Sequence, residues 1–126
     1  MNSRQKGARG EREAAALLRS LGFEARRGQQ YNGVEGQDVV HSIPGVHIEV
    51  KRTETLSVYA AVAQAVTDAA GNLPVVLHKR NRKDWLFIVR AEDVLRFARV
   101  ITEAGAARVS DASTNGTTRA RTAPRP

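Results

Sequence analysis

Apolar and polar residues repeat with different periods along this chain, and the changes of period divide it into elements. Residues 3–21 carry apolar side chains at helical spacing, with Ala8, Ala15 and Leu18 on one stripe, which predicts a helix. Glu11 falls on the same stripe. An acid on the core side of a helix is costly unless something pairs with it or binds it. An ion pair with an arginine and a functional role are therefore both open for Glu11.

A period of two takes over after Gly22. Residues 23–29 predict a first strand, and residues 29–36, which include two glycines, predict a loop that helps to shape a site. Residues 37–52 are rich in β-branched side chains around Pro44-Gly45, so they predict two strands joined by a turn.

The order of side chains in this hairpin depends on its register. If Pro44 and Gly45 are the whole loop, Asp38 lies opposite Lys51, and Glu49 is diagonal to it on the same face. A shift of one residue would place Asp38 on the other face.

The second half of the chain predicts a helix over residues 58–70, two strands over 73–77 and 85–90, and a helix from 91 to about 102. The basic run between the two strands is then a hairpin tip. These elements predict an α/β fold, a mixed sheet of about five strands flanked by helices.

Length and composition narrow the class of protein. A chain of 126 residues suits one domain, which we place at 1–103, and the shift to Ala, Ser, Thr, Gly, Arg and Pro predicts a disordered basic tail over 104–126. There is no cysteine, which excludes disulfides and thiolate chemistry. No apolar run approaches the roughly 20 residues of a membrane span, and we expect a cytoplasmic protein, in the host cytoplasm if it is phage-encoded.

The net charge of +7, from 20 basic and 13 acidic residues, suits a nucleic-acid partner, although a biased composition would also produce it. The basic run at the predicted hairpin tip, residues 78–83, could equally be a solvated turn. The candidate phosphate-binding side chains are Arg4, Lys6, Arg9, Arg26, Arg27, Arg52, Lys79, Arg80, Arg82 and Lys83.

Acidic and basic residues meet in the predicted hairpin. Asp38 and Glu49 provide carboxylates, and the Val50 carbonyl a third oxygen, which are ligands that Mg²⁺ prefers. Lys51 is suited to orient a water or to stabilise charge on a phosphate, and Glu11 could extend the site. The same residues would also suit an exposed sheet face with cross-strand ion pairs.

The order of these segments resembles a known family. Glu11-Arg12-Glu13, Gly22-Phe23 before Arg26 and Arg27, Gln37-Asp38-Val39-Val40 and Ile48-Glu49-Val50-Lys51 resemble the PD-(D/E)xK nuclease superfamily over residues 7–90. More narrowly, they resemble archaeal-type Holliday junction resolvases and their phage-encoded relatives. One departure is Gln37, where the family usually has proline.

The resemblance implies a restriction-endonuclease-like core and a homodimer that cuts branched DNA in recombination or repair. It implies Mg²⁺, which Mn²⁺ can replace, bound by Asp38, Glu49, the Val50 carbonyl and Glu11, with Lys51 as the catalytic lysine. No small-molecule cofactor is implied. The DNA contacts that it implies are Arg12, one of Arg26 and Arg27, and Gln64.

Three hypotheses follow from these observations. The first is a Mg²⁺-dependent endonuclease that resolves four-way junctions by paired nicks. The second keeps this chemistry for flaps, ends or duplex DNA, and the third is a basic DNA-binding module without catalysis. We expect His41, His47 and His78, which are scattered along the chain, to be sheet or surface residues and not metal ligands.

Overall fold

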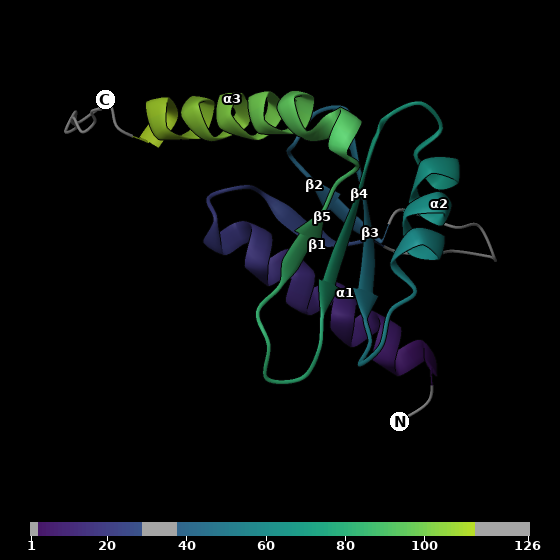
Figure 1. Ribbon diagram of the computed structural model, residues 1–126. Helices are drawn as coiled ribbons and strands as arrows, with labels where there is room; N and C mark the ends of the chain where they lie inside the picture. Colours follow the sequence, from purple (N-terminus) through teal and green to yellow (C-terminus); the bar gives the residue numbers. More distant parts are fainter. Residues whose placement is uncertain (1–2, 29–37, 113–126) are drawn as a thin grey trace.

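The computed structural model describes residues 3–28 and 38–112, and the side chains of residues 7–28 and 38–105. In chain order the elements are α1 (Ser3–Ser20), β1 (Ala25–Arg27), β2 (Val39–His41), β3 (Val46–Arg52), α2 (Val58–Ala69), β4 (Leu73–Lys79), β5 (Leu86–Ile88), a 3-10 turn η1 (Ala91–Asp93) and α3 (Val94–Ala112). Figure 1 shows their arrangement.

The strands form two sheets. In one, β1 and β2 are antiparallel; in the other, β3 is parallel to β4, which is antiparallel to β5. The predicted α/β fold, in which helices flank a mixed sheet, is confirmed. The five described strands, however, are divided between two sheets. In Figure 1, α1 and α2 lie on opposite sides of the three-stranded sheet.

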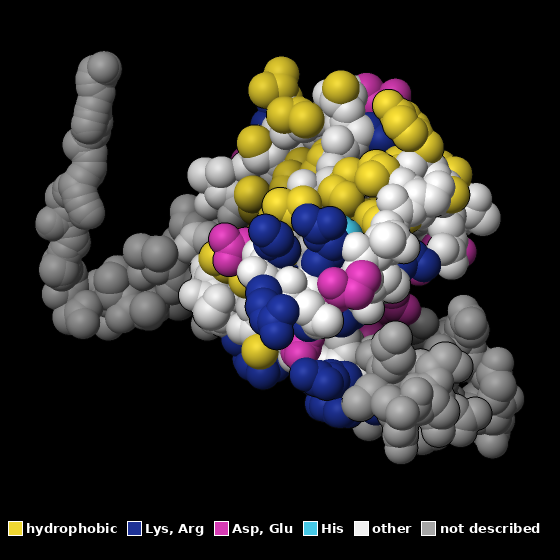
Figure 2. Space-filling view, turned by 60° about the horizontal axis from the view of Figure 1, so that its bottom comes forward, with side chains coloured by type: hydrophobic (Ala, Val, Ile, Leu, Met, Phe, Trp, Pro, Cys, Tyr) yellow, Lys and Arg dark blue, Asp and Glu magenta, His cyan; other side chains and the backbone are white. Residues whose placement is uncertain are grey.

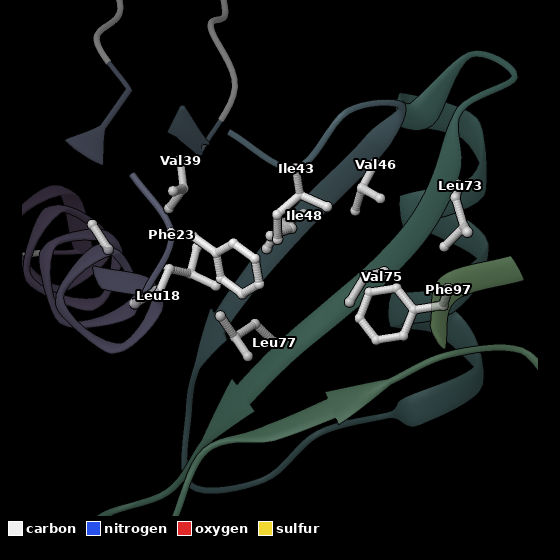
Figure 3. Packing of buried hydrophobic residues seen from close by; sticks show 12 residues of the cluster. Leu18, Phe23, Val39, Ile43, Val46, Ile48, Leu73, Val75, Leu77 and Phe97 are labelled. Atoms are coloured by element: carbon white, nitrogen blue, oxygen red, sulfur yellow. The ribbon is translucent and has the colours of Figure 1, made fainter. Parts of the chain in front are cut away.

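Strand β4 is the centre of the packing. Six of its seven residues are buried, a pattern typical of a strand that is covered on both faces. Leu73, Val75 and Leu77 join the large core with α1 and α3, whereas Val76 packs with Ala61 and Ala65 of α2. Figure 3 shows the large core, in which Leu18 and Phe97 come from the two long helices. Neighbouring β3 is therefore held between two layers.

The predicted hairpin is wrong in its pairing. Gly45 has a φ of +72°, so the turn is present, but β2 pairs with β1, and β3 pairs with β4. The chain leaves the ladder before the turn, because Ile43 is buried in the core and its N–H donates to His41 Nδ1 at 3.1 Å. No ladder joins β2 to β3 in the described part of the chain, and Asp38 is not paired with Lys51.

Helix α3 is longer than predicted. It continues to Ala112, where a disordered tail from residue 104 was expected. Val100, Ile101 and Ala104 pack against the core with Phe97, so the apolar stripe continues past the predicted end at spacings of three and four residues. The rest of the expected tail (113–126) and the expected loop (29–36) lie outside the described residues.

The other boundaries follow the predictions closely. Helix α1 ends before Gly22, which has a φ of +102° that favours glycine. Ser57 is the N-cap of α2, although its side chain makes no capping hydrogen bond. Within the described residues, no helix has the length and apolar character that crossing a membrane requires.

Candidate active site

Strand β3 sorts its side chains between two faces. Val46 and Ile48 are buried in the large core, and Val50 packs against it. The alternate residues turn toward α2: Lys51 Nζ donates to Gln64 Oε1 at 2.9 Å, and carboxylate oxygens of Glu49 and of Asp68 on the same helix lie within 4.8 Å of each other. Glu49 and Lys51 therefore share a face, as the period of two predicts.

Asp38 immediately precedes β2, and its side chain reaches the edge of β3. Its Oδ2 accepts a hydrogen bond from the Val50 N–H at 2.9 Å. The N–H and C=O of a strand residue point to the same edge, so the Val50 carbonyl is directed toward the Asp38 side. The hairpin register was wrong, yet Asp38 still lies beside the Glu49–Lys51 segment, because its side chain takes the place of a ladder partner.

Glu11 comes from α1 to the same place. Its Oε1 accepts a hydrogen bond from Arg27 Nε at 3.1 Å. Burial raises the pKa of Glu11 above its usual value, and the charge of Asp38 raises it further against the opposing effects of Arg27 and Arg12. The structure thus contains both an ion pair with an arginine and an approach to a second acid.

Glu49 is the most confined member of the group, with 9% of its side chain exposed. Its pKa is raised by burial and by the charge of Asp38, with a smaller effect from Asp68, while His47 and Lys51 act in the opposite direction. We define the acidic group as Glu11, Asp38 and Glu49. A cation beside it would relieve the repulsion that these shifts record, so the donor set fits a hard divalent metal.

Two residues near Glu49 were missed by the sequence reasoning. His47 Nε2 lies 3.1 Å from Glu49 Oε1, and ligand atoms of His47, Glu49 and Asp68 all lie within 4.8 Å of one another. His47 could have been found from its position two residues before Glu49. Asp68 follows Gln64 by four residues on a helix, which places both on one side of α2.

The three histidines have different surroundings. His78 is buried in β4, with Nε2 2.9 Å from the Thr53 carbonyl oxygen, and His41 Nδ1 accepts the Ile43 N–H. Both are sheet histidines, as expected. His47 is also a sheet residue, in β3, and its ring lies beside two carboxylates.

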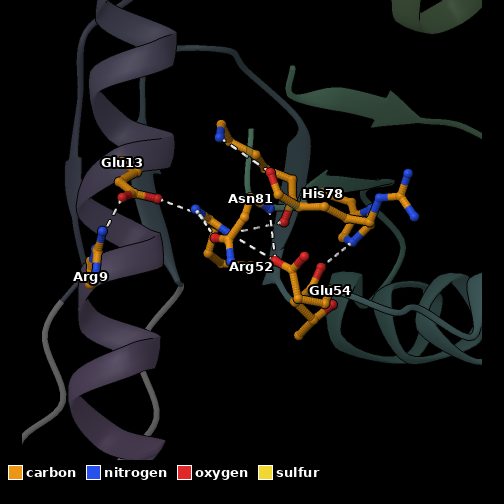
Figure 4. Close-up of polar contacts among 9 residues, drawn as sticks. Arg9, Glu13, Arg52, Glu54, His78 and Asn81 are labelled. Carbon is orange, nitrogen blue, oxygen red and sulfur yellow. Dashed lines mark hydrogen bonds and ion pairs between the residues drawn. The ribbon is translucent and has the colours of Figure 1, made fainter. Parts of the chain in front are cut away.

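Arg52 was predicted to contact DNA, but the structure bonds it within the protein. Its Nε donates to Glu13 Oε1 at 2.7 Å and its Nη2 to Asn81 Oδ1 at 3.0 Å, and Nη1 lies 3.8 Å from Glu54. Only 17% of its side chain is exposed. We call Arg52, Glu13, Glu54 and Asn81 the Arg52 network; it joins α1, β3 and the β4–β5 turn (Figure 4).

The other predicted basic residues are mostly available to solvent. Figure 2 shows Lys and Arg side chains gathered beside an apolar area on the face that it views. Lys79 is half-buried, Arg9 is bonded to Glu13 yet 60% exposed, and the side chains of Arg4 and Lys6 are outside those described. The exposed residues are Arg9, Arg12, Arg26, Arg27, Arg80, Arg82 and Lys83, and Gln64 is exposed on α2.

No model of a known protein family matches this chain, and no curated protein does either. Among solved structures, that of Archaeoglobus fulgidus Hjc, a Holliday junction resolvase from an archaeal hyperthermophile, is similar to it. The two are 30% identical with a TM-score of 0.49, over 67% of this chain and 72% of that chain.

Proposed function

We propose that the protein is a metal-dependent endonuclease that resolves four-way DNA junctions by paired nicks. The observation that carries the proposal is the convergence of three acids from three segments at one edge of β3. Asp38 is bonded to the Val50 N–H there, and its charge acts on both Glu11 and Glu49. Lys51 follows on the same strand. Two of these carboxylates, Glu11 and Glu49, have raised pKa values, which is typical of a functional site.

Asp38, Glu49 and the Val50 carbonyl would hold Mg²⁺, or Mn²⁺ in its place, and Glu11 would complete the ligand set. When bound, the metal would lower the pKa of a water and stabilise charge on the phosphate. The Val50 N–H fixes the Asp38 carboxylate in place before any ligand arrives. Rigid carboxylates favour binding because less side-chain entropy is lost on complex formation.

Lys51 would act on the phosphate. Its bond to Gln64 Oε1 holds the ammonium group near the acidic group and uses one of its three protons. The remaining protons can be donated to a phosphate oxygen or to the attacking water. Gln64 is in this view a positioning residue, which agrees with the glutamine that the family resemblance implies on this helix.

The substrate side of the proposal depends on exposed cations. The charge of Arg12 acts on Glu11, and exposed Arg26 precedes Arg27, which donates to Glu11. Arg80, Arg82 and Lys83 lie in the β4–β5 turn. Arginine and lysine contacts to phosphates position DNA without reading its sequence. We therefore expect weak sequence specificity, and a strong preference for one duplex sequence at moderate salt would contradict this. A single small domain needs a second copy to address two strands, so we infer a homodimer acting on DNA in the cytoplasm.

The test is a cleavage assay with a labelled mobile four-way junction and a linear duplex of matched sequence, both with Mg²⁺. The wild-type protein is compared with Glu49→Ala and with Glu92→Ala, whose carboxylate is 74% exposed on η1. We expect paired symmetric nicks on the junction alone, lost in Glu49→Ala and kept in Glu92→Ala. Equal cutting of both substrates would support a nuclease for flaps, ends or duplex DNA instead. Binding without cutting over several divalent metals would reject the enzyme.

A further inference from the structure

The side of Glu49 that faces α2 has a second set of metal-ligating atoms. We propose that His47, Glu49 and Asp68 form a separate cation site that takes a first-row transition ion, such as Zn²⁺ or Co²⁺, in preference to Mg²⁺. This site shares only Glu49 with the acidic group. It does not depend on the proposed nuclease activity, because binding of the ion can be measured on the protein alone.

The geometry is close to that of a bound site. Metal bonds to imidazole nitrogen and carboxylate oxygen are about 2.0–2.2 Å long, which places neighbouring ligand atoms about 3–4 Å apart. His47 Nε2 and Glu49 Oε1 are already 3.1 Å apart, and the Asp68 oxygen lies within 4.8 Å of both. Asp68 is exposed on α2, so its side chain can close the remaining distance by a change of rotamer.

The donors decide the class of ion. An imidazole nitrogen with carboxylate oxygens suits zinc, cobalt and similar ions, whereas Mg²⁺ favours oxygen ligands. The side chains of His47 and Glu49 are only 11% and 9% exposed, so they form the buried side of the site, to which water has little access. Asp68 stands on the open side, where waters would complete the coordination.

A simple hydrogen bond between His47 and Glu49 is the competing explanation. It accounts for the 3.1 Å contact but not for the approach of a further acid. Ligand atoms of His47, Glu49 and Asp68 all lie within 4.8 Å of one another, and Lys51 directs its described hydrogen bond to Gln64. Like charges that are gathered around a buried carboxylate are relieved by a cation.

The experiment titrates metal-free, full-length protein with Co²⁺, whose visible absorption reports the coordination geometry, and with Zn²⁺ by calorimetry. Four variants are compared with the wild type: His47→Gln, Asp68→Asn, Asp38→Asn and Asp84→Asn. Asp38→Asn removes a charge from the other side of Glu49, and Asp84→Asn is the matched change at an exposed acid near β5. Thermal unfolding without metal confirms that each variant is folded.

We expect one ion per chain, with affinity reduced at least tenfold in His47→Gln and Asp68→Asn, by a smaller factor in Asp38→Asn, and unchanged within about threefold in Asp84→Asn, since loss of even an outer-shell partner costs 10–100-fold. Asp68 is exposed, so Asp68→Asn tests the site even if His47→Gln does not fold. Absence of Co²⁺ and Zn²⁺ binding, or equal binding by Asp68→Asn, would overturn the proposal. Loss of binding in Asp38→Asn alone would assign the ion to the acidic group instead.

Discussion

Glu11 and Glu13 are two residues apart on α1, and they have opposite surroundings. Burial raises the pKa of Glu11, and the nearby charge of Asp38 adds to that rise. Burial would also raise the pKa of Glu13, but the hydrogen bonds and charges of Arg52 and Arg9 outweigh it and leave the pKa lowered. One carboxylate belongs to the acidic group and the other to the Arg52 network.

The difference between Glu11 and Glu13 indicates that the acidic group serves binding and the Arg52 network serves stability. The Arg52 network is satisfied within the protein, so its members stabilise the contact of α1 with β3 and with the β4–β5 turn. In the acidic group, burial and the charge of Asp38 raise the pKa values of Glu11 and Glu49, as is typical of sites that bind or catalyse. Changes in the two clusters should therefore affect different measurements.

The largest expected effect is on cleavage. Asp38→Asn keeps an oxygen that can accept the Val50 N–H, but it removes a charge from the acidic group. We expect the single-turnover rate on a junction to fall by about 100-fold or more, with little change in the melting temperature. Glu13→Gln is the control, and its rate should stay within about threefold of the wild type. Wild-type cleavage by Asp38→Asn would remove the acidic group from the mechanism.

The Arg52 network should respond in the opposite sense. Arg52→Met leaves Glu13 with Arg9 as its remaining partner and removes the donor to the Asn81 side chain. We expect a loss of about 2–3 kcal/mol of unfolding free energy, below the value for a fully buried pair because Glu13 is partly exposed. Urea unfolding measures this loss. Cleavage at a temperature where the variant is folded should change little.

The matched control for this prediction is Arg9→Met, which removes the other partner of Glu13. Arg9 is 60% exposed, so its loss should cost about 0.5 kcal/mol or less. Equal losses for the two variants would contradict a network that is centred on Arg52.

A third prediction concerns the close contact of α1 and β3 at Arg52. A Cβ added at Gly10 would lie 2.6 Å from Arg52 Cβ, which cannot move without its strand. We expect Gly10→Ala to destabilise the protein by about 1–2 kcal/mol. In the same helix, nothing lies within 4 Å of a Cβ at Gly7, so Gly7→Ala should stabilise it by about 0.5–1 kcal/mol through helix propensity. Stabilisation by both changes would show that the α1–β3 contact at Gly10 can accommodate a methyl group.

The smallest effects compare the two glutamates directly. Glu11 has a raised folded-state pKa, so its contribution to stability is present below the unfolded value of 4.5 and is lost as the pH rises through the folded value. Glu13 has a lowered pKa, so its contribution is present above 4.5 and is lost as the pH falls through the folded value.

Without metal at pH 7, Glu11→Gln should therefore raise the melting temperature and Glu13→Gln should lower it, each by about 1–3 °C. Both shifts should fade in acid, where the wild-type carboxylates become protonated. Thermal unfolding in a chelating buffer at several pH values measures this, and shifts of the same sign would contradict the comparison.

Much of the fold could be predicted because its signals are local. The stripe of α1, the Pro44-Gly45 turn and the alternation in β3 depend on residues a few positions apart. The pairing of β2 with β1 could not be predicted in this way. The pairing depends on Ile43, which is buried in a core formed by segments far apart in the chain. Local signals do not show this burial, so the sequence favoured the simpler hairpin.

The site, like the fold, has features that local sequence predicts and features that contacts between distant segments decide. The residue types and the common face of Glu49 and Lys51 follow from the sequence, because successive strand side chains alternate by covalent geometry. Arg52 was assigned to DNA because a free basic side chain and a bonded one look alike in a sequence. Its partners Glu13 and Asn81 come from two other segments.

By itself, then, the sequence determined the elements, the set of acids and lysine, and the β3 face that Glu49 and Lys51 share, since these depend on near neighbours. Tertiary structure alone decided that Asp38 bonds to Val50, that Glu11 and Glu13 have opposite environments, and that Asp68 meets His47. The physical reason is that charge and hydrogen-bond energies depend on distance in space, which packing sets between segments far apart in the chain.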